Sequence, residues 1–123
     1  MHALVVDDSS TMRMILREFL KKLGFEVSEA GNGQEALDRL KAMGKADLVL
    51  VDWNMPVMDG VSFVRAVRAD PGYATLPLLM VTTNTELSQV SMALEAGANE
   101  YIMKPFTREM VRQKLELLGF LEV

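Results

Sequence analysis

The sequence contains no cysteine, which excludes disulfide bonds and thiol chemistry. It also has no apolar run near the ~20 residues that a membrane-spanning helix needs. Basic residues are in the minority, since 13 Lys and Arg stand against 17 Asp and Glu and the net charge is −4. Such a chain does not attract nucleic acid or an anionic membrane. An apolar, strand-like run begins at residue 3, which leaves no room for a signal peptide. We therefore expect a cytoplasmic protein.

Strand-like and helix-like segments alternate five times along the 123 residues. The predicted strands are residues 3–6, 25–29, 48–51, 78–81 and 101–103. The predicted helices are residues 10–23, 33–43, 61–68, 86–96 and 107–118, with Ser9 or Ser10 suited to cap the first. Continuous apolar strands are typical of a parallel sheet that is covered by helices on both faces. The pattern predicts one α/β domain over residues 1–123, built on a doubly wound five-stranded sheet with five helices.

Polar residues follow four of the predicted strands, at the point where each strand ends. They are Asp7 and Asp8, Asp52, Thr82 and Thr83, and Lys104 with Pro105. The carboxyl ends of parallel strands meet at one edge of the sheet, where ligands bind in folds of this kind. We therefore expect these side chains to converge.

Clustered carboxylates raise one another's pKa unless a cation joins them. Mg²⁺ is the natural candidate because it prefers oxygen ligands, and Asp7 and Asp8 are predicted to hold it. Asp52 is the most central of the three and can act as a nucleophile that forms an aspartyl-phosphate. Lys104 and Thr82 would then bind oxygens of the transferring phosphoryl group.

Simpler explanations exist for several of these residues. The carboxylates could be solvated strand ends, and Asp8 could cap the first helix. Asp59 with Gly60 is interpreted as a turn and helix cap. Residues 31–36 fit a dinucleotide-binding glycine pattern, but they follow the second strand, so we interpret them as a turn and helix start. Residues 9–11 could cradle a flavin phosphate, which the adjacent carboxylates would repel unless a metal intervened.

Four motifs together resemble the receiver domains of two-component response regulators, specifically the CheY-like single-domain chemotaxis type. They are Val5-Val6-Asp7-Asp8-Ser9, Val51-Asp52-Trp53-Asn54-Met55-Pro56-Val57-Met58-Asp59-Gly60, Val81-Thr82-Thr83 and Tyr101-Ile102-Met103-Lys104-Pro105-Phe106. The resemblance covers the whole chain. It implies a flavodoxin-like sheet of strand order 2-1-3-4-5, as in flavodoxin and CheY.

The resemblance also implies a role for each site residue. Mg²⁺ would be bound by carboxylates and by one backbone carbonyl, that of Asn54. A cis peptide bond is expected before Pro105. The implied roles are Asp52 as phosphoacceptor and metal ligand, Asp7 and Asp8 as metal carboxylates, Lys104 as the phosphate-pairing lysine, Thr82 as the switch hydroxyl and Tyr101 as the switch aromatic.

By the same resemblance, the protein is a phosphoacceptor rather than a turnover enzyme. Its phosphodonor would be a histidine kinase, because His2 is the only histidine and is not expected to carry phosphate. Its output would be a protein target, with the flagellar motor switch as one candidate, and a phosphatase could act on it. The fourth helix, fifth strand and fifth helix would form the output face. Residues 84–103 include Glu86, Glu95 and Glu100 but no Lys or Arg, which disfavours direct contact with nucleic acid.

Three alternatives stay open at this point. A phosphorelay intermediate would use the same site in another pathway. A phosphorylation-independent adaptor would keep the fold without using the site. A hydrolytic phosphatase would need a substrate cap or further catalytic groups, and none is evident in the sequence.

Overall fold

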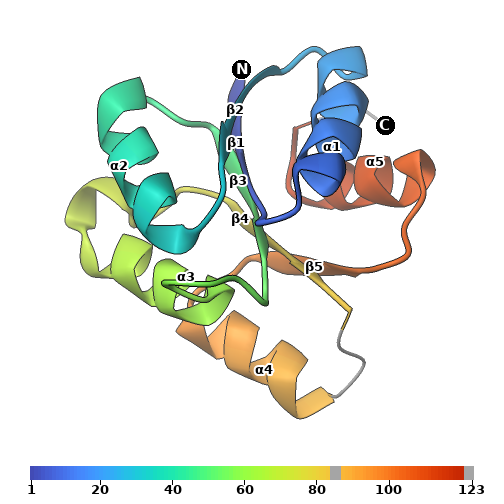
Figure 1. Cartoon of the computed structure of the whole chain (residues 1–123). Coiled ribbons are helices and arrows are strands. Elements are labelled where there is room, and N and C mark those ends of the chain that lie inside the picture. Colours follow the sequence, from blue (N-terminus) through green and yellow to red (C-terminus); the bar gives the residue numbers. More distant parts are fainter. Residues whose placement is uncertain (84–86, 121–123) are drawn as a thin grey trace.

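The computed structural model describes residues 1–83 and 87–120, in which strands and helices alternate as predicted (Figure 1). The strands are β1 (His2–Val6), β2 (Glu26–Ala30), β3 (Leu48–Asp52), β4 (Leu78–Thr82) and β5 (Glu100–Met103). The helices are α1 (Ser10–Lys22), α2 (Gly33–Met43), α3 (Gly60–Ala69), the 3-10 helix η1 (Pro71–Tyr73), α4 (Leu87–Ala96) and α5 (Arg108–Leu117). Element ends lie within about one residue of the predicted ones. The predicted start of the fourth helix at Glu86 falls outside the described residues.

The five strands form one parallel sheet of order β2-β1-β3-β4-β5, which confirms the predicted fold. The register brings the carboxyl ends of the inner strands level. Val6 pairs with Val51, and Asp52 pairs with Val81. The residues that follow these strands therefore emerge at one edge of the sheet.

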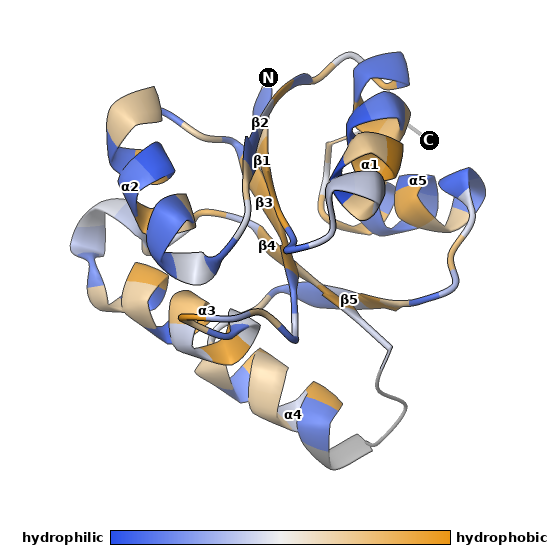
Figure 2. Ribbon diagram, in the orientation of Figure 1, coloured by the Kyte–Doolittle hydropathy of each residue, from blue (hydrophilic) through white to orange (hydrophobic). Residues whose placement is uncertain are grey.

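Helices cover both faces of the sheet (Figure 1). Helices α2, α3 and α4 pack on one face, where Phe63 lies in a core with alternate strand residues such as Val49. Helices α1 and α5 pack on the other, where Leu16 and Leu115 meet the opposite set, including Leu50. Figure 2 shows the matching pattern, with apolar central strands and helices of mixed character. Among the described residues, no helix is long and apolar enough to cross a membrane.

Four of the α-helices begin at a side chain that caps the backbone. Ser9 caps α1, Asn32 caps α2, Asp59 caps α3 and Thr107 caps α5. The alternative in which Asp8 caps the first helix is therefore wrong, and Asp59 is a cap as predicted. Asn32 caps a helix that follows the edge strand β2, which confirms that residues 31–36 are a turn and helix start.

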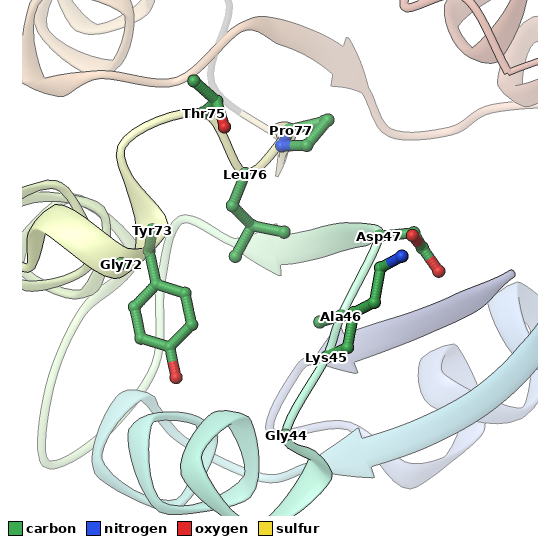
Figure 3. Close-up of a pocket in the computed structure, with 9 residues that line it drawn as sticks. All are labelled: Gly44, Lys45, Ala46, Asp47, Gly72, Tyr73, Thr75, Leu76 and Pro77. Carbon is green, nitrogen blue, oxygen red and sulfur yellow. The ribbon is translucent and has the colours of Figure 1, made fainter.

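The amino edge of the sheet is closed by polar groups that bind one another. Arg68 donates to the carbonyl oxygens of Gly97 (2.9 Å) and Tyr73 (2.8 Å) and to Asn99 Oδ1 (2.9 Å). Asp47 Oδ2 accepts a hydrogen bond from the His2 backbone N–H at 2.8 Å. A hollow of about 250 Å³ opens here between residues 44–47 and 72–77 (Figure 3). It lies at the starts of β3 and β4, at the opposite edge from the predicted site.

Candidate functional site

Three carboxylates meet at the carboxyl edge of the sheet, as predicted. One oxygen each from Asp7, Asp8 and Asp52 lies within 4.8 Å of the others. Asp7 is 1% exposed and Asp52 is 7% exposed, whereas Asp8 faces solvent. Burial raises the pKa of Asp52, the charge of Asp7 adds to that rise, and Lys104 opposes it. The cluster therefore stores unfavourable electrostatic energy when no cation is bound.

Lys104 bridges the two buried carboxylates. Its Nζ lies 3.3 Å from Asp7 Oδ2 and 3.3 Å from Asp52 Oδ1. The Lys104 backbone N–H donates to the Thr82 carbonyl oxygen at 2.7 Å, and the bond to Pro105 is cis, as the resemblance implied. One ammonium does not neutralise three carboxylates, so the cluster keeps an excess of negative charge. An all-oxygen donor set with excess negative charge fits a hard divalent cation such as Mg²⁺.

Arg13 fixes the loop that carries the first two carboxylates. Its Nη1 donates to the Asp7 carbonyl oxygen at 2.6 Å, and its Nε pairs with Glu29 at 3.2 Å. The Ser9 backbone N–H binds Asp7 Oδ1 at 2.9 Å and so orients that carboxylate. Sequence reasoning missed Arg13, because no motif marks it and its partners come from β1 and β2. Glu29 is shared with Arg17, which lies 2.8 Å away. Because Arg13 binds the backbone carbonyl of Asp7 and not its carboxylate, its role is to position the loop.

The loop between β3 and α3 forms the mouth of the site. An open hollow of about 550 Å³ is lined by Asp8, Asn54, Met55, Pro56 and Asp59. Asn54 thus lies beside the exposed carboxylate, on the side from which a ligand would enter. The hollow connects the carboxylate cluster with solvent.

Two glycines let this loop lie close to its neighbours. A Cβ on Gly60 would sit 2.2 Å from the Asp52 carbonyl oxygen, so only glycine allows α3 to start so near β3. A Cβ on Gly33 would sit 2.9 Å from the Met58 carbonyl oxygen, so α2 also touches the loop. Within the loop, Val57 adopts a φ of 69° although 82% of it is exposed. That conformation is unfavourable for a β-branched residue.

Thr82 and Tyr101 stand behind the carboxylate cluster. Thr82 is 3% exposed at the end of β4, and Tyr101 is half-buried on β5. Both line one small enclosed space beneath α4. On the outer side, Lys114 Nζ lies 4.8 Å from the centre of the Tyr101 ring and 2.8 Å from Glu100 Oε1. Glu86, which sequence reasoning assigned to this face, lies outside the described residues.

Comparison with known proteins agrees with this geometry. The sequence profile of the family described as "Response regulator receiver domain" matches residues 3–116. The chain belongs to this family. The receiver domain is 46% identical over 119 residues to the chemotaxis protein CheY1 of Helicobacter pylori strain J99, an alignment that covers 96% of each chain. It is thus homologous to the CheY chemotaxis response regulators and is a two-component signalling protein.

Solved structures give the same assignment for this receiver domain. The chemotaxis response regulator CheY4 of Vibrio cholerae has a TM-score of 0.88 and 36% identity, covering 94% of this chain and 96% of the other. The receiver domain of a Pseudomonas aeruginosa sensor histidine kinase has a TM-score of 0.85 and 28% identity, covering 94% of each chain. That structure is described with a magnesium ion coordinated in its active-site cleft.

Proposed function

We propose that this chain is a single receiver domain over residues 1–123 that accepts a phosphoryl group on Asp52 from a histidine kinase. The observation that carries the proposal is the position of Lys104, whose Nζ is 3.3 Å from both Asp52 and Asp7. A lysine held against a buried nucleophile is suited to bind an oxygen of an incoming phosphoryl group. At the amino edge, by contrast, Asp47 binds a backbone N–H and no lysine side chain among the described residues.

Mg²⁺ is the cofactor that the site would use. The carboxylates of Asp7, Asp8 and Asp52 and the backbone carbonyl of Asn54 would hold it. The ion would neutralise charge on the phosphoryl oxygens while transfer takes place. The excess negative charge of the cluster and its all-oxygen donor set support this assignment.

In the transfer step, a carboxylate oxygen of Asp52 attacks phosphorus and forms the new P–O bond. The P–N bond to the histidine of the kinase breaks, and the imidazole leaves with the electron pair. The Lys104 ammonium and the Thr82 hydroxyl would bind phosphoryl oxygens and align the group. Attack of water on the aspartyl-phosphate would later release phosphate, with or without a phosphatase. The domain therefore changes state and does not turn over a small substrate.

Phosphorylation would be read out on the face formed by α4, β5 and α5. Movement of Thr82 toward the phosphoryl group vacates space into which Tyr101 can turn, and the outer contact of Tyr101 with Lys114 would be lost. The two arrangements form an equilibrium that the added charge biases. Met103 and Met110 are exposed on this face and offer apolar contacts to a protein partner. Homology to chemotaxis regulators favours a cytoplasmic chemotaxis pathway, with the flagellar motor switch as the candidate target.

The test is phosphorylation by acetyl phosphate in the presence of Mg²⁺, followed by intact-protein mass spectrometry. The wild type should gain one phosphoryl group, and removal of Mg²⁺ with EDTA should prevent the gain. Asp52→Asn should gain none. Asp47→Asn is the matched control at the opposite edge and should behave as wild type. Equal phosphorylation of Asp52→Asn and wild type would exclude Asp52 as the acceptor, and a chain that no donor phosphorylates would favour an adaptor role.

A further inference from the structure

A small enclosed space lies between α4 and the sheet, directly behind the carboxylate cluster. It is too small to admit a water molecule. Its walls come from α4, β4, β5 and the residue after β3. The lining residues are Trp53, Met80, Thr82, Gln89, Val90, Ala93 and Tyr101.

Gln89 contributes an unsatisfied polar group to this region. Its Oε1 is buried and has no hydrogen-bond partner among the described residues. No water fits in the adjacent space to supply one. The amide is placed with its oxygen as the buried acceptor, and that oxygen receives no hydrogen bond from the described residues. A buried polar group without a partner disfavours the conformation that contains it.

Two hydroxyl groups belong to residues that line the same space, those of Thr82 and Tyr101. In the proposed function Thr82 turns toward the phosphoryl group, which leaves the hydroxyl of Tyr101 as the one that can bind Gln89. A phenol hydroxyl both donates and accepts, so it can satisfy either end of the amide. Among the described residues, no side-chain hydrogen bond joins the Tyr101 hydroxyl to a partner, so a bond to Gln89 would displace none.

Tyr101 stands at the boundary between this space and the surface. One side of the residue lines the enclosed space, and the other lines an open hollow of about 220 Å³ on the output face. Lys114 holds the outer side of the ring with its Nζ 4.8 Å from the ring centre. An inward turn would exchange this partly exposed cation–π contact for a buried hydrogen bond.

We propose that Gln89 is a positioning residue of the switch, whose side-chain amide binds the Tyr101 hydroxyl in the phosphorylated state and whose Oε1 has no hydrogen-bond partner among the described residues in the free state. This inference rests on the proposed function, since it needs phosphorylation at Asp52 to move Thr82. The orphaned amide raises the free energy of the free state, and the new bond lowers that of the phosphorylated state. Both effects of Gln89 shift the equilibrium toward the signalling conformation.

The test compares wild type with Gln89→Met, which keeps the length of the side chain and removes both polar atoms. The probe is beryllium fluoride with Mg²⁺, an analogue of the phosphoryl group on a carboxylate. Its binding is followed by the fluorescence of Trp53 and by ¹⁹F NMR of fluorotyrosine-labelled protein, in which Tyr73 serves as the internal reference. Gln34→Met, on the exposed side of α2, is the matched control.

We expect Gln89→Met to bind the probe about three- to tenfold more weakly than wild type, the loss that one hydrogen bond accounts for. The Tyr101 resonance should shift less at saturation, and the free protein should unfold at the same temperature as wild type or higher. Gln34→Met should match wild type in all three measurements. In a Tyr101→Phe background, Gln89→Met should cause no further loss of affinity, because the hydroxyl is already absent.

Three outcomes would overturn the inference. If wild type responds to the probe and Gln89→Met responds equally well, Gln89 has no part in the switch, while the proposed function stands. If Gln89→Met weakens binding equally with and without the Tyr101 hydroxyl, Gln89 acts through packing and not through the bond. If wild type itself does not respond to the probe, the proposed function fails, and this inference fails with it.

Discussion

The two edges of the sheet use similar side chains to opposite effect. The amino edge carries Lys45 and Asp47, and the carboxyl edge carries Lys104 and Asp52. Asp47 is partly exposed and binds a backbone N–H, while Lys45 is exposed. Asp52, in contrast, is 7% exposed and shares one lysine with a second buried carboxylate.

The difference lies in how completely the polar groups are satisfied. At the amino edge, the Asn99 side-chain oxygen accepts from both Arg68 and the Leu78 backbone N–H, which ties the ends of three elements together. At the carboxyl edge, carboxylates outnumber the cation, and the pKa of Asp52 is raised. The amino edge therefore stabilises the fold, whereas the carboxyl edge keeps an excess of negative charge that a bound cation can neutralise. Substitutions at matched positions on the two edges can test this contrast.

The largest difference is expected for the two lysines. Lys104→Met removes a preorganised cation and should slow phosphorylation by acetyl phosphate about 100-fold, or about 3 kcal/mol. Lys45→Met should leave the rate unchanged, because Lys45 is exposed and distant from the carboxylates. The measurement is a time course of phosphoryl incorporation by mass spectrometry at saturating Mg²⁺. Equal rates for Lys104→Met and Lys45→Met would remove the functional distinction between the edges.

A similar contrast in stability is expected for two glycines. Gly60→Ala would bring a Cβ to 2.2 Å from the Asp52 carbonyl oxygen. The start of α3 must then shift, at a cost of about 2 kcal/mol. Gly72→Ala at the amino edge meets only the Asp70 side chain, at 3.3 Å, and should change stability far less. Urea unfolding measures the stability of both variants. If Gly60→Ala is as stable as Gly72→Ala, the loop before α3 can move to accommodate the added Cβ at little cost.

The excess of negative charge at the carboxyl edge predicts that the stability of the fold depends on pH. Folding raises the pKa of Asp52 above its ordinary value of 3.8. The contribution of Asp52 to the stability of the fold is therefore complete when the pH is below this ordinary pKa. It is lost as the pH rises through the higher pKa that Asp52 has in the folded state. In EDTA at neutral pH, Asp52→Asn should be more stable than wild type by about 1 kcal/mol.

Thermal unfolding across pH measures this effect. The advantage of Asp52→Asn should shrink as the pH falls toward the ordinary carboxyl pKa. Asp47→Asn should show no such advantage, because its carboxylate is already satisfied by a backbone N–H. If Asp52→Asn is no more stable than wild type at neutral pH, the charge of Lys104 alone offsets the electrostatic cost of the buried carboxylates.

The smallest effect is expected at Val57. Its φ of 69° is better suited to asparagine, and its side chain is 82% exposed, so little packing would be lost on substitution. Val57→Asn should stabilise the protein by about 0.5 kcal/mol. Urea unfolding would detect the gain. A loss of stability instead would mean that the Val57 side chain makes a contact that outweighs the strain.

The sequence was sufficient to predict the sheet and the convergence of acidic and basic side chains at its carboxyl edge. Apolar strands that end in Asp7, Asp52 and Lys104 follow a pattern local to each strand, and parallel pairing alone brings the ends together. The dinucleotide-like segment 31–36 was also interpreted correctly, because the strand before it lies at the edge of the sheet.

Other features depend on contacts between distant segments and could not be predicted in this way. The hydrogen bond from Arg13 to the Asp7 carbonyl oxygen depends on how α1 leans on the first loop. The orphaned amide of Gln89 depends on how closely α4 packs on β4 and β5. The left-handed conformation of Val57 runs against the ordinary preference of valine, so its sequence predicts the opposite.

The order of the strands along the chain also determines when the carboxylates gain their lysine. Lys104 meets Asp52 across 52 positions and Asp7 across 97. The bridge exists only after β5 has joined the sheet, so a chain still emerging from the ribosome, or one truncated before its fifth strand, has carboxylates without their lysine. Completion of the carboxylate cluster with its lysine thus depends on the last strand of the sheet.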